Sequence, residues 1–227
     1  MTCSRLSFRF AWLLLAGLGA GAGCLTDPGL FAQVATTGAK SGPPTAADTL
    51  WRQAPLFRSL EDALAQQASG QPVYRLDLSR QGLREAPAEI AALTDLRELR
   101  LRKNRLSTLP ESWSALTHLV EFDASINRFS AFPSVILRWT QLRHLDLGDN
   151  DLEGLPEDID VLQKLEVLSV WSNPLERYPA SLSDLPALQK LDLLHNLLDP
   201  EEHQWIQDLL PGVVVILSPP CQCDFSP

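Results

Sequence analysis

The sequence predicts a repeat solenoid, a fold in which short units stack one after another along a single axis. Six segments share one pattern of leucines and follow each other at steps of 23 residues without insertion or deletion; they begin at residues 76, 99, 122, 145, 168 and 191. An amide column and a proline column accompany them: Gln81, Asn104, Asn127, Asn150, Asn173 and Asn196, then Pro87, Pro110, Pro133, Pro156 and Pro179. A fixed period of this length is the signature of a solenoid.

The first 23 residues are typical of an export signal. A basic start, MTCSRLSFR, precedes the apolar run FAWLLLAGLGA and then small residues. The uncharged span from Phe10 to Thr26 is 17 residues long and rich in glycine. That length is marginal for a bilayer whose apolar core is roughly 30 Å thick. The sequence therefore favours a cleaved signal over a membrane anchor.

The stretch GAGC at residues 21–24 resembles the lipobox of bacterial lipoproteins, in which the cysteine is acylated and becomes the new N-terminus. It departs from that pattern at Gly21, where leucine is usual. The resemblance implies lipidation of Cys24 and a membrane-anchored lipoprotein of the bacterial cell envelope. The alternative is ordinary cleavage near Ala20 or Gly23, with a free thiol at Cys24 and a secreted or periplasmic protein.

Two further cysteines, Cys221 and Cys223, stand near the C-terminus. A disulfide between them would close a small, strained ring. The CQC stretch offers two metal ligands, and no cluster of histidine or cysteine stands beside it. Neither a disulfide nor a metal site is predicted there.

Residues 24–55 are rich in alanine, threonine, glycine, serine and proline, which predicts a flexible linker. Residues 56–72 predict an N-terminal capping helix. Ser59 is placed to cap it, and Glu61 and Asp62 fall in the first turn, where the helix dipole favours negative charge. We expect this helix to close the open end of the repeats.

The repeat pattern LxxLxLxxNxLxxLPxxIxxL, over residues 73–199, resembles the leucine-rich repeat family, in its 23-residue class. The resemblance implies an α/β fold, a right-handed horseshoe-shaped solenoid with a parallel β-sheet on its concave side. The residues agree, because alternating Leu99 and Leu101 predict a strand with one buried face. The proline then starts a short helical or irregular return. No repeat can bury its leucines alone, so stacking provides the stability and the ends need caps.

The asparagine column is predicted to be architectural, because a buried amide can bond the main chain where it bends after each strand. Residues 200–227 are expected to form a C-terminal cap and tail. The cap combines an amphipathic helix in DPEEHQWIQDLLPG with a strand in VVVIL. The step of 23 residues places Val214 opposite Leu191 and Ile216 opposite Leu193.

The repeat register sorts the tryptophans. Trp113 and Trp205 fall in a column of isoleucines and Trp139 in a column of leucines, so all three are predicted to be core. Trp171 falls in a column that points out of the sheet. A large apolar side chain on that polar face has a packing partner only if Leu194 and Val167 shelter it. We predict a ligand anchor; the alternatives are chance exposure or packing on the C-terminal tail.

The concave face is expected to run from basic through acidic to apolar along the strands. Its candidate ligand-binding residues are Arg100, Arg102, Lys103, Glu121, Asp123, His144, Asp146, Asp149, Val167, Trp171 and Leu194.

Catalysis is not predicted. Asp149, Ser172 and His195 share one column, but the serine stands between the other two, whereas a catalytic triad needs histidine between nucleophile and carboxylate. Asp123 and Asp146 form a carboxylate pair without a closed cleft. No metal ligands, cofactor motif or catalytic residues are assigned. The net charge of -9, about -11 without the leader, argues against nucleic acid as a partner.

These observations predict an exported binding module, a monomer, that holds a protein or peptide ligand on its concave face. It would meet a membrane only through a lipid on Cys24. One alternative is a structural or adhesive cell-envelope lipoprotein whose surface acts through number and tether. Another is an intracellular signalling scaffold, which an uncleaved N-terminus would favour.

Overall fold

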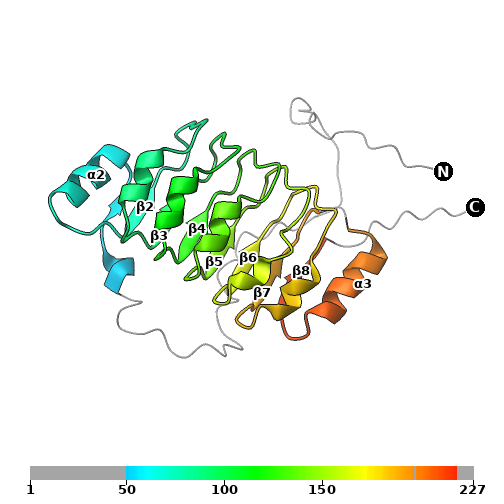
Figure 1. Ribbon diagram of the computed structural model, residues 1–227. Helices are drawn as coiled ribbons and strands as arrows, with labels where there is room; N and C mark the ends of the chain where they lie inside the picture. Colours follow the sequence, from blue (N-terminus) through cyan, green and yellow to red (C-terminus); the bar gives the residue numbers. More distant parts are fainter. Residues whose placement is uncertain (1–49, 197, 219–227) are drawn as a thin grey trace, which may run out of the picture. The chain divides into compact units, whose positions relative to one another are not determined.

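The computed structural model describes residues 50–196 and 198–218 of the 227-residue chain. The leader, Cys24, Cys221 and Cys223 lie outside the described residues. The described part is one sheet of eight parallel strands in chain order (Figure 1). The strands are β1 Leu56–Phe57, β2 Arg75–Asp77, β3 Glu98–Arg100, β4 Glu121–Asp123, β5 His144–Asp146, β6 Val167–Ser169, β7 Lys190–Asp192 and β8 Val214–Ile216. The predicted leucine-rich repeat solenoid is confirmed.

Short 3-10 helices form the returns between strands. They are η3 Ala88–Ala92, η4 Glu111–Ala115, η5 Ser134–Arg138, η6 Ile159–Val161 and η7 Ala180–Asp184. The repeated proline is the N-cap of η3, η4, η5 and η7. Its fixed φ suits the start of a helical turn, and its missing N–H costs no bond there.

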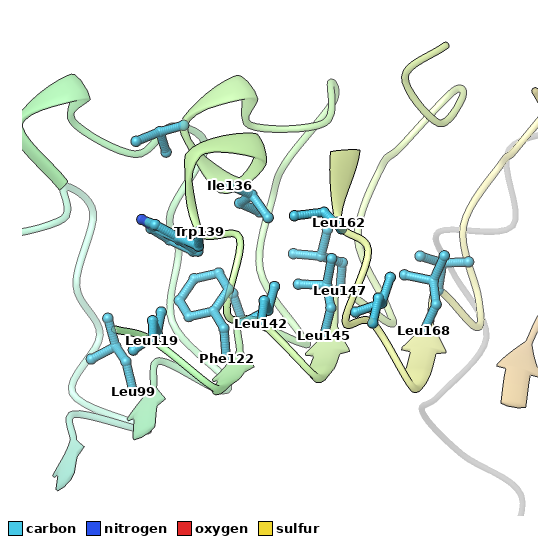
Figure 2. Close-up of a cluster of buried hydrophobic side chains, with 14 of the residues drawn as sticks. Leu99, Leu119, Phe122, Ile136, Trp139, Leu142, Leu145, Leu147, Leu162 and Leu168 are labelled. Atoms are coloured by element: carbon cyan, nitrogen blue, oxygen red, sulfur yellow. The ribbon is translucent and has the colours of Figure 1, made fainter. Parts of the chain in front are cut away.

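The core lies between the strands and these returns. Figure 2 shows strand residues such as Phe122 and Leu145 facing Ile136 and Leu162 of the returns. Phe122 meets Trp139 edge to face, with ring centroids 5.0 Å apart. The indole N–H of Trp139 donates to the Trp113 carbonyl at 2.9 Å, so this buried polar group is satisfied. Trp113 and Trp139 are fully buried, as predicted.

The prediction that Trp205 belongs to the core is wrong. Trp205 lies on α3, Pro200–Leu209, and is 42% exposed, while its neighbour Ile206 is fully buried. The repeat register assumed a short 3-10 return at this place. An α-helix turns by 3.6 residues, so a different side chain faces the core.

The asparagine column is buried and bonded to the main chain. Asn150 is representative: its Nδ2 donates to the carbonyls of Leu147 at 2.9 Å and Ala124 at 3.2 Å, and its Oδ1 accepts from the Phe129 N–H at 3.1 Å. Two of these three bonds reach the preceding repeat. Gln81, in the first repeat, instead donates to the Arg58 carbonyl at 3.0 Å.

Both ends are capped. The helix α2, Leu60–Ala68, starts at Ser59, whose hydroxyl accepts from the Asp62 N–H at 3.2 Å. At the other end Asp199 and Glu202 form a capping box on α3. No helix within the described ranges is long and apolar enough to cross a membrane.

The ends also differ from the sequence predictions in three ways. The strand β1, ahead of α2, was not predicted. Residues Trp51–Gln53, assigned to the linker, form the 3-10 helix η2. The strand β8 pairs Leu191 with Val215, not with Val214, because the α-helical return adds one residue to the step of 23. Val214 is accordingly 53% exposed.

Candidate binding face

Parallel pairing aligns the outward side chains of the sheet into columns on its concave face. We call the column at the start of the strands the first column; its members from β2 to β7 are Arg75, Glu98, Glu121, His144, Val167 and Lys190. The second column holds Asp77, Arg100, Asp123, Asp146, Ser169 and Asp192. The third, just beyond the strands, holds Ser79, Arg102, Ser125, Gly148, Trp171 and Leu194.

The chain turns sharply after the third column. The next residue of every repeat has a left-handed backbone with φ between 51° and 61°: Arg80, Lys103, Ile126, Asp149, Ser172 and His195. Lys103 and Asp149 are therefore exposed at this turn and do not lie on the strands. Asp149 and His195 belong to repeats separated by that of Ser172, the order that argues against a triad.

Trp171 lies against the neighbouring strand at Gly148. An ideal Cβ built on Gly148 would fall 2.0 Å from the indole Nε1 and 2.3 Å from Cε2. The ring thus fills the space that any side chain on Gly148 would need, and Trp171 is half-buried. The expectation that only Leu194 and Val167 could shelter Trp171 was wrong. The sequence carried the signal, because Gly148 stands one repeat before Trp171 in the same column.

Two carboxylates face each other beside this indole. Asp123 and Asp146 are paired across β4 and β5. An oxygen of Asp146 accepts from the Gly148 N–H at 2.9 Å, which ties it to the residue that Trp171 covers. Asp123 accepts from the Ser125 N–H at 2.9 Å.

The Asp146 carboxyl holds its proton more tightly than an ordinary aspartate. Burial raises its pKa to about 6, and the charge of Asp123 adds to the rise. The hydrogen bonds from Gly148 and Ser169 and the charge of Arg102 act in the opposite direction. The middle of the concave face therefore carries more negative charge than its own cations compensate.

The arginines of the predicted basic end already have partners. Arg100 pairs with Glu98 at 2.6 Å, and Arg75 pairs with the other oxygen of Glu98 at 2.6 Å. Arg102 donates to the Ser125 hydroxyl at 2.7 Å. These groups are held in place by neighbours on the sheet, so the predicted basic end is a set of ion pairs and hydrogen bonds.

Glu121 stands at the centre of a second cluster in the first column. It binds Arg52 at 2.7 Å and lies 3.6 Å from Nδ1 of His144. Burial alone would raise the pKa of Glu121, but the hydrogen bond and charge of His144 and the charges of Arg52 and Arg100 lower it. His144 also lies 3.9 Å from Glu166, which Arg143 binds at 2.6 Å.

The described residues contain no group of three or more histidine, cysteine or acidic side chains able to hold a metal ion. The structure thus brings together Trp171, Gly148 and Asp146 in one place, and Glu121 and His144 in another. Arg52 belongs to the second group, and the sequence gave no signal for it because it lies in a segment without a repeat pattern.

Comparisons with known proteins agree with this architecture. Models of the leucine rich repeat match residues 140–198 and 95–116. No curated protein sequence matches the chain. Among solved structures, a leucine-rich repeat protein of Leptospira interrogans is 34% identical, with a TM-score of 0.56 over 63% of this chain and 35% of that one.

Two further structures have the same TM-score of 0.56. An internalin of Listeria monocytogenes is 26% identical and covers 64% of this chain and 42% of its own. Toll of Drosophila, in its complex with Spatzle, is 25% identical and covers 65% of this chain and 22% of its own. The chain thus spans less than half the length of each of these proteins. The two repeat models and the shared solenoid support the leucine-rich repeat family as the family of this chain.

Proposed function

We propose that this protein is an exported binding module that holds a protein or peptide ligand on its concave face. The observation that carries the proposal is the indole of Trp171, laid on the open face of the sheet over Gly148. A ring that is already fixed loses little conformational entropy on binding, and tryptophan is enriched among the residues that dominate interfaces. The Toll structure, a complex with Spatzle, supports a protein as the ligand class.

Charge favours a ligand with basic groups. Asp123 and Asp146 share the face with Trp171, and Asp146 has its pKa raised to about 6 because its charge is poorly compensated. A cation placed there would relieve that repulsion and could lie against the indole ring. We therefore expect a ligand segment that carries lysine or arginine next to an apolar group.

Photo-crosslinking in the producing cells tests this function. A photoreactive amino acid at Leu194, next to Trp171 in the third column, should capture a defined protein. The same group at Val161, which is 40% exposed on η6, is the control for non-specific capture. Trp171→Ala should weaken binding of the captured protein by about 2 kcal/mol, roughly 30-fold, without unfolding the solenoid. Equal capture from both positions would instead favour an adhesive envelope protein, and an unchanged affinity would remove Trp171 from the site.

Export and lipidation are tested separately. The leader sequence supports export, and the resemblance of GAGC to a lipobox supports acylation of Cys24. Cells fed a labelled fatty-acid analogue should label the protein, and Cys24→Ser should abolish the label. A label that persists in the variant, or an uncleaved N-terminus, would contradict the lipoprotein proposal.

A further inference from the structure

The segment just before β1 lies over the concave face. The guanidinium of Arg75 donates to the carbonyls of Arg52 at 2.9 Å and Ala54 at 3.3 Å. Arg52 in turn binds Glu121 on β4. Three strand spacings, roughly 14 Å, separate β1 from β4, which is farther than one arginine side chain reaches. The main chain at Arg52 therefore crosses the first column above β2 and β3.

Trp51 is buried by this arrangement, although it lies outside the core. Its exposed fraction is only 6%, yet it does not belong to the cluster of core side chains between the strands and the returns. The guanidinium of Arg52 lies 5.2 Å from the centre of its ring, a cation–π distance. The solenoid thus presents a polar sheet face to its own N-terminal segment, and a tryptophan and an arginine are held there.

We propose that Arg75, Glu98, Glu121 and His144 form a peptide subsite that this chain fills with its own Trp51–Arg52. The subsite would take an aromatic residue followed by arginine: Arg75 binds main-chain carbonyls, which every peptide offers, and Glu121 binds the guanidinium. This inference rests on the proposed function, since it assigns one part of the same concave face. An external ligand must displace residues 51–54 to occupy all of it.

The internal segment is suited to being displaced. The guanidinium side chain of Arg52 is 52% exposed, so its ion pair with Glu121 is weak. A covalently attached segment nevertheless acts at a high effective concentration and excludes weak competitors. Only a ligand that also reaches a second contact, such as Trp171, would gain enough to replace it. The segment therefore selects ligands that contact both parts of the face.

A synthetic peptide with the sequence of residues 48–56, DTLWRQAPL, tests the subsite on the full chain. Its binding is followed through the amide NMR signals of β2, β3 and β4. The chain carrying Trp51→Gly and Arg52→Gly should bind the peptide at least about tenfold more tightly than the unaltered chain, because its subsite is open. Adding Glu121→Ala, or using a peptide with glutamate in place of arginine, should remove the binding. Equal affinity for both chains, no binding to the folded variant, or no effect of Glu121→Ala would overturn the proposal.

Hydrogen exchange on the unaltered chain gives a second test that does not depend on folding of the variant. The Ala54 N–H donates to the Trp51 carbonyl at 3.1 Å in the docked segment. Excess peptide should speed exchange at Ala54 about tenfold or more and leave α2 unchanged. Unchanged exchange at Ala54 would contradict displacement. Both tests use no outside partner, so their failure leaves the crosslinking result at Leu194 intact, and the reverse also holds.

Discussion

The contact between Trp171 and Gly148 joins two neighbouring repeats through one missing side chain. The backbone of Gly148 does not need glycine, because its φ lies outside the left-handed region. The residue is required by the indole that covers it. Glycine at this position is therefore a packing requirement of the concave face and not a feature of the turn.

Replacing Gly148 by alanine should destabilise the protein, because the new methyl group would collide with the indole. We expect a loss of about 1–3 kcal/mol in the free energy of unfolding, the usual cost of overpacking. In a Trp171→Ala background the same substitution should cost much less. Urea denaturation of the four proteins of this double-mutant cycle measures the coupling. Equal losses in both backgrounds would show that the ring and Gly148 are independent.

Asp146 gives a prediction about pH. Its pKa in the folded state is raised from 3.8 to about 6, mainly by burial, so folding favours the protonated form. The cost of ionising Asp146 is therefore present above pH 6 and disappears as the pH falls toward 4. Asp146→Asn should raise the free energy of unfolding by about 1–2 kcal/mol at pH 7, allowing for partial solvent exposure, and by little at pH 4.

Denaturant titrations at several pH values between 4 and 7 measure this difference. Asp77→Asn is the matched control, because Asp77 accepts the equivalent main-chain bond from Ser79 at 2.9 Å in the first repeat. A constant difference between parent and Asp146→Asn across this range would contradict the role given to burial.

Among the elements, the bends after the strands repeat a backbone conformation that their residues do not favour. Ile126 is the extreme case: a β-branched residue with φ of 57°. Its amide still donates to the Gly148 carbonyl at 2.8 Å, so the neighbouring repeat holds the bend in place. The strain is offset by stacking and not by local preference.

Ile126→Asn should therefore stabilise the protein by about 1 kcal/mol, since asparagine tolerates the left-handed region. The midpoint and slope of urea unfolding report the change. Ser172→Asn, at φ of 54° in another repeat, is the comparison, and it should gain less because serine is not β-branched. A destabilised Ile126→Asn protein would mean that the half-buried side chain contributes more than the backbone strain costs.

The strands and returns of the repeats could be predicted because one physical constraint fixes them together. A leucine at the wrong place in a step of 23 would turn from the core to the solvent, so the period determines strand, face and return at once. That constraint ends where the repeat ends. Trp205 and Val214 were misplaced because α3 replaces a 3-10 return, and β1 and η2 were missed because nothing before residue 73 repeats.

The candidate site was predictable only as a set of columns. The register located Trp171, Asp123 and Asp146 on one face, since pairing of parallel strands follows from the period. It could not give side-chain directions, so the cover of the indole over Gly148 and the reach of Arg52 to Glu121 were beyond it. Such contacts depend on rotamers and on segments far apart in the sequence.

For the whole molecule, stacking implies that repeats can be removed in units of one period. Deleting residues 176–198, one complete step, joins Leu175 to Asp199 in the place of Leu198. The shortened chain should still unfold cooperatively, with a smaller dependence of unfolding free energy on urea because less surface is exposed. Deleting residues 177–198, one residue fewer, should abolish cooperative unfolding because the columns no longer align. Similar behaviour of the two deletions would contradict register as the organising constraint.

The asparagine bonds also give the solenoid a direction in time. Each of Asn104, Asn127, Asn150 and Asn173 bonds groups of the repeat before it, as when Asn173 accepts from the Leu152 N–H at 3.0 Å. A bend is therefore completed only after the following repeat has been synthesised. On the ribosome, where the N-terminal repeats emerge first, the newest repeat always leaves an amide of its bend unsatisfied until its successor arrives. Synthesis and folding would then advance together, one period behind each other, from α2 toward α3.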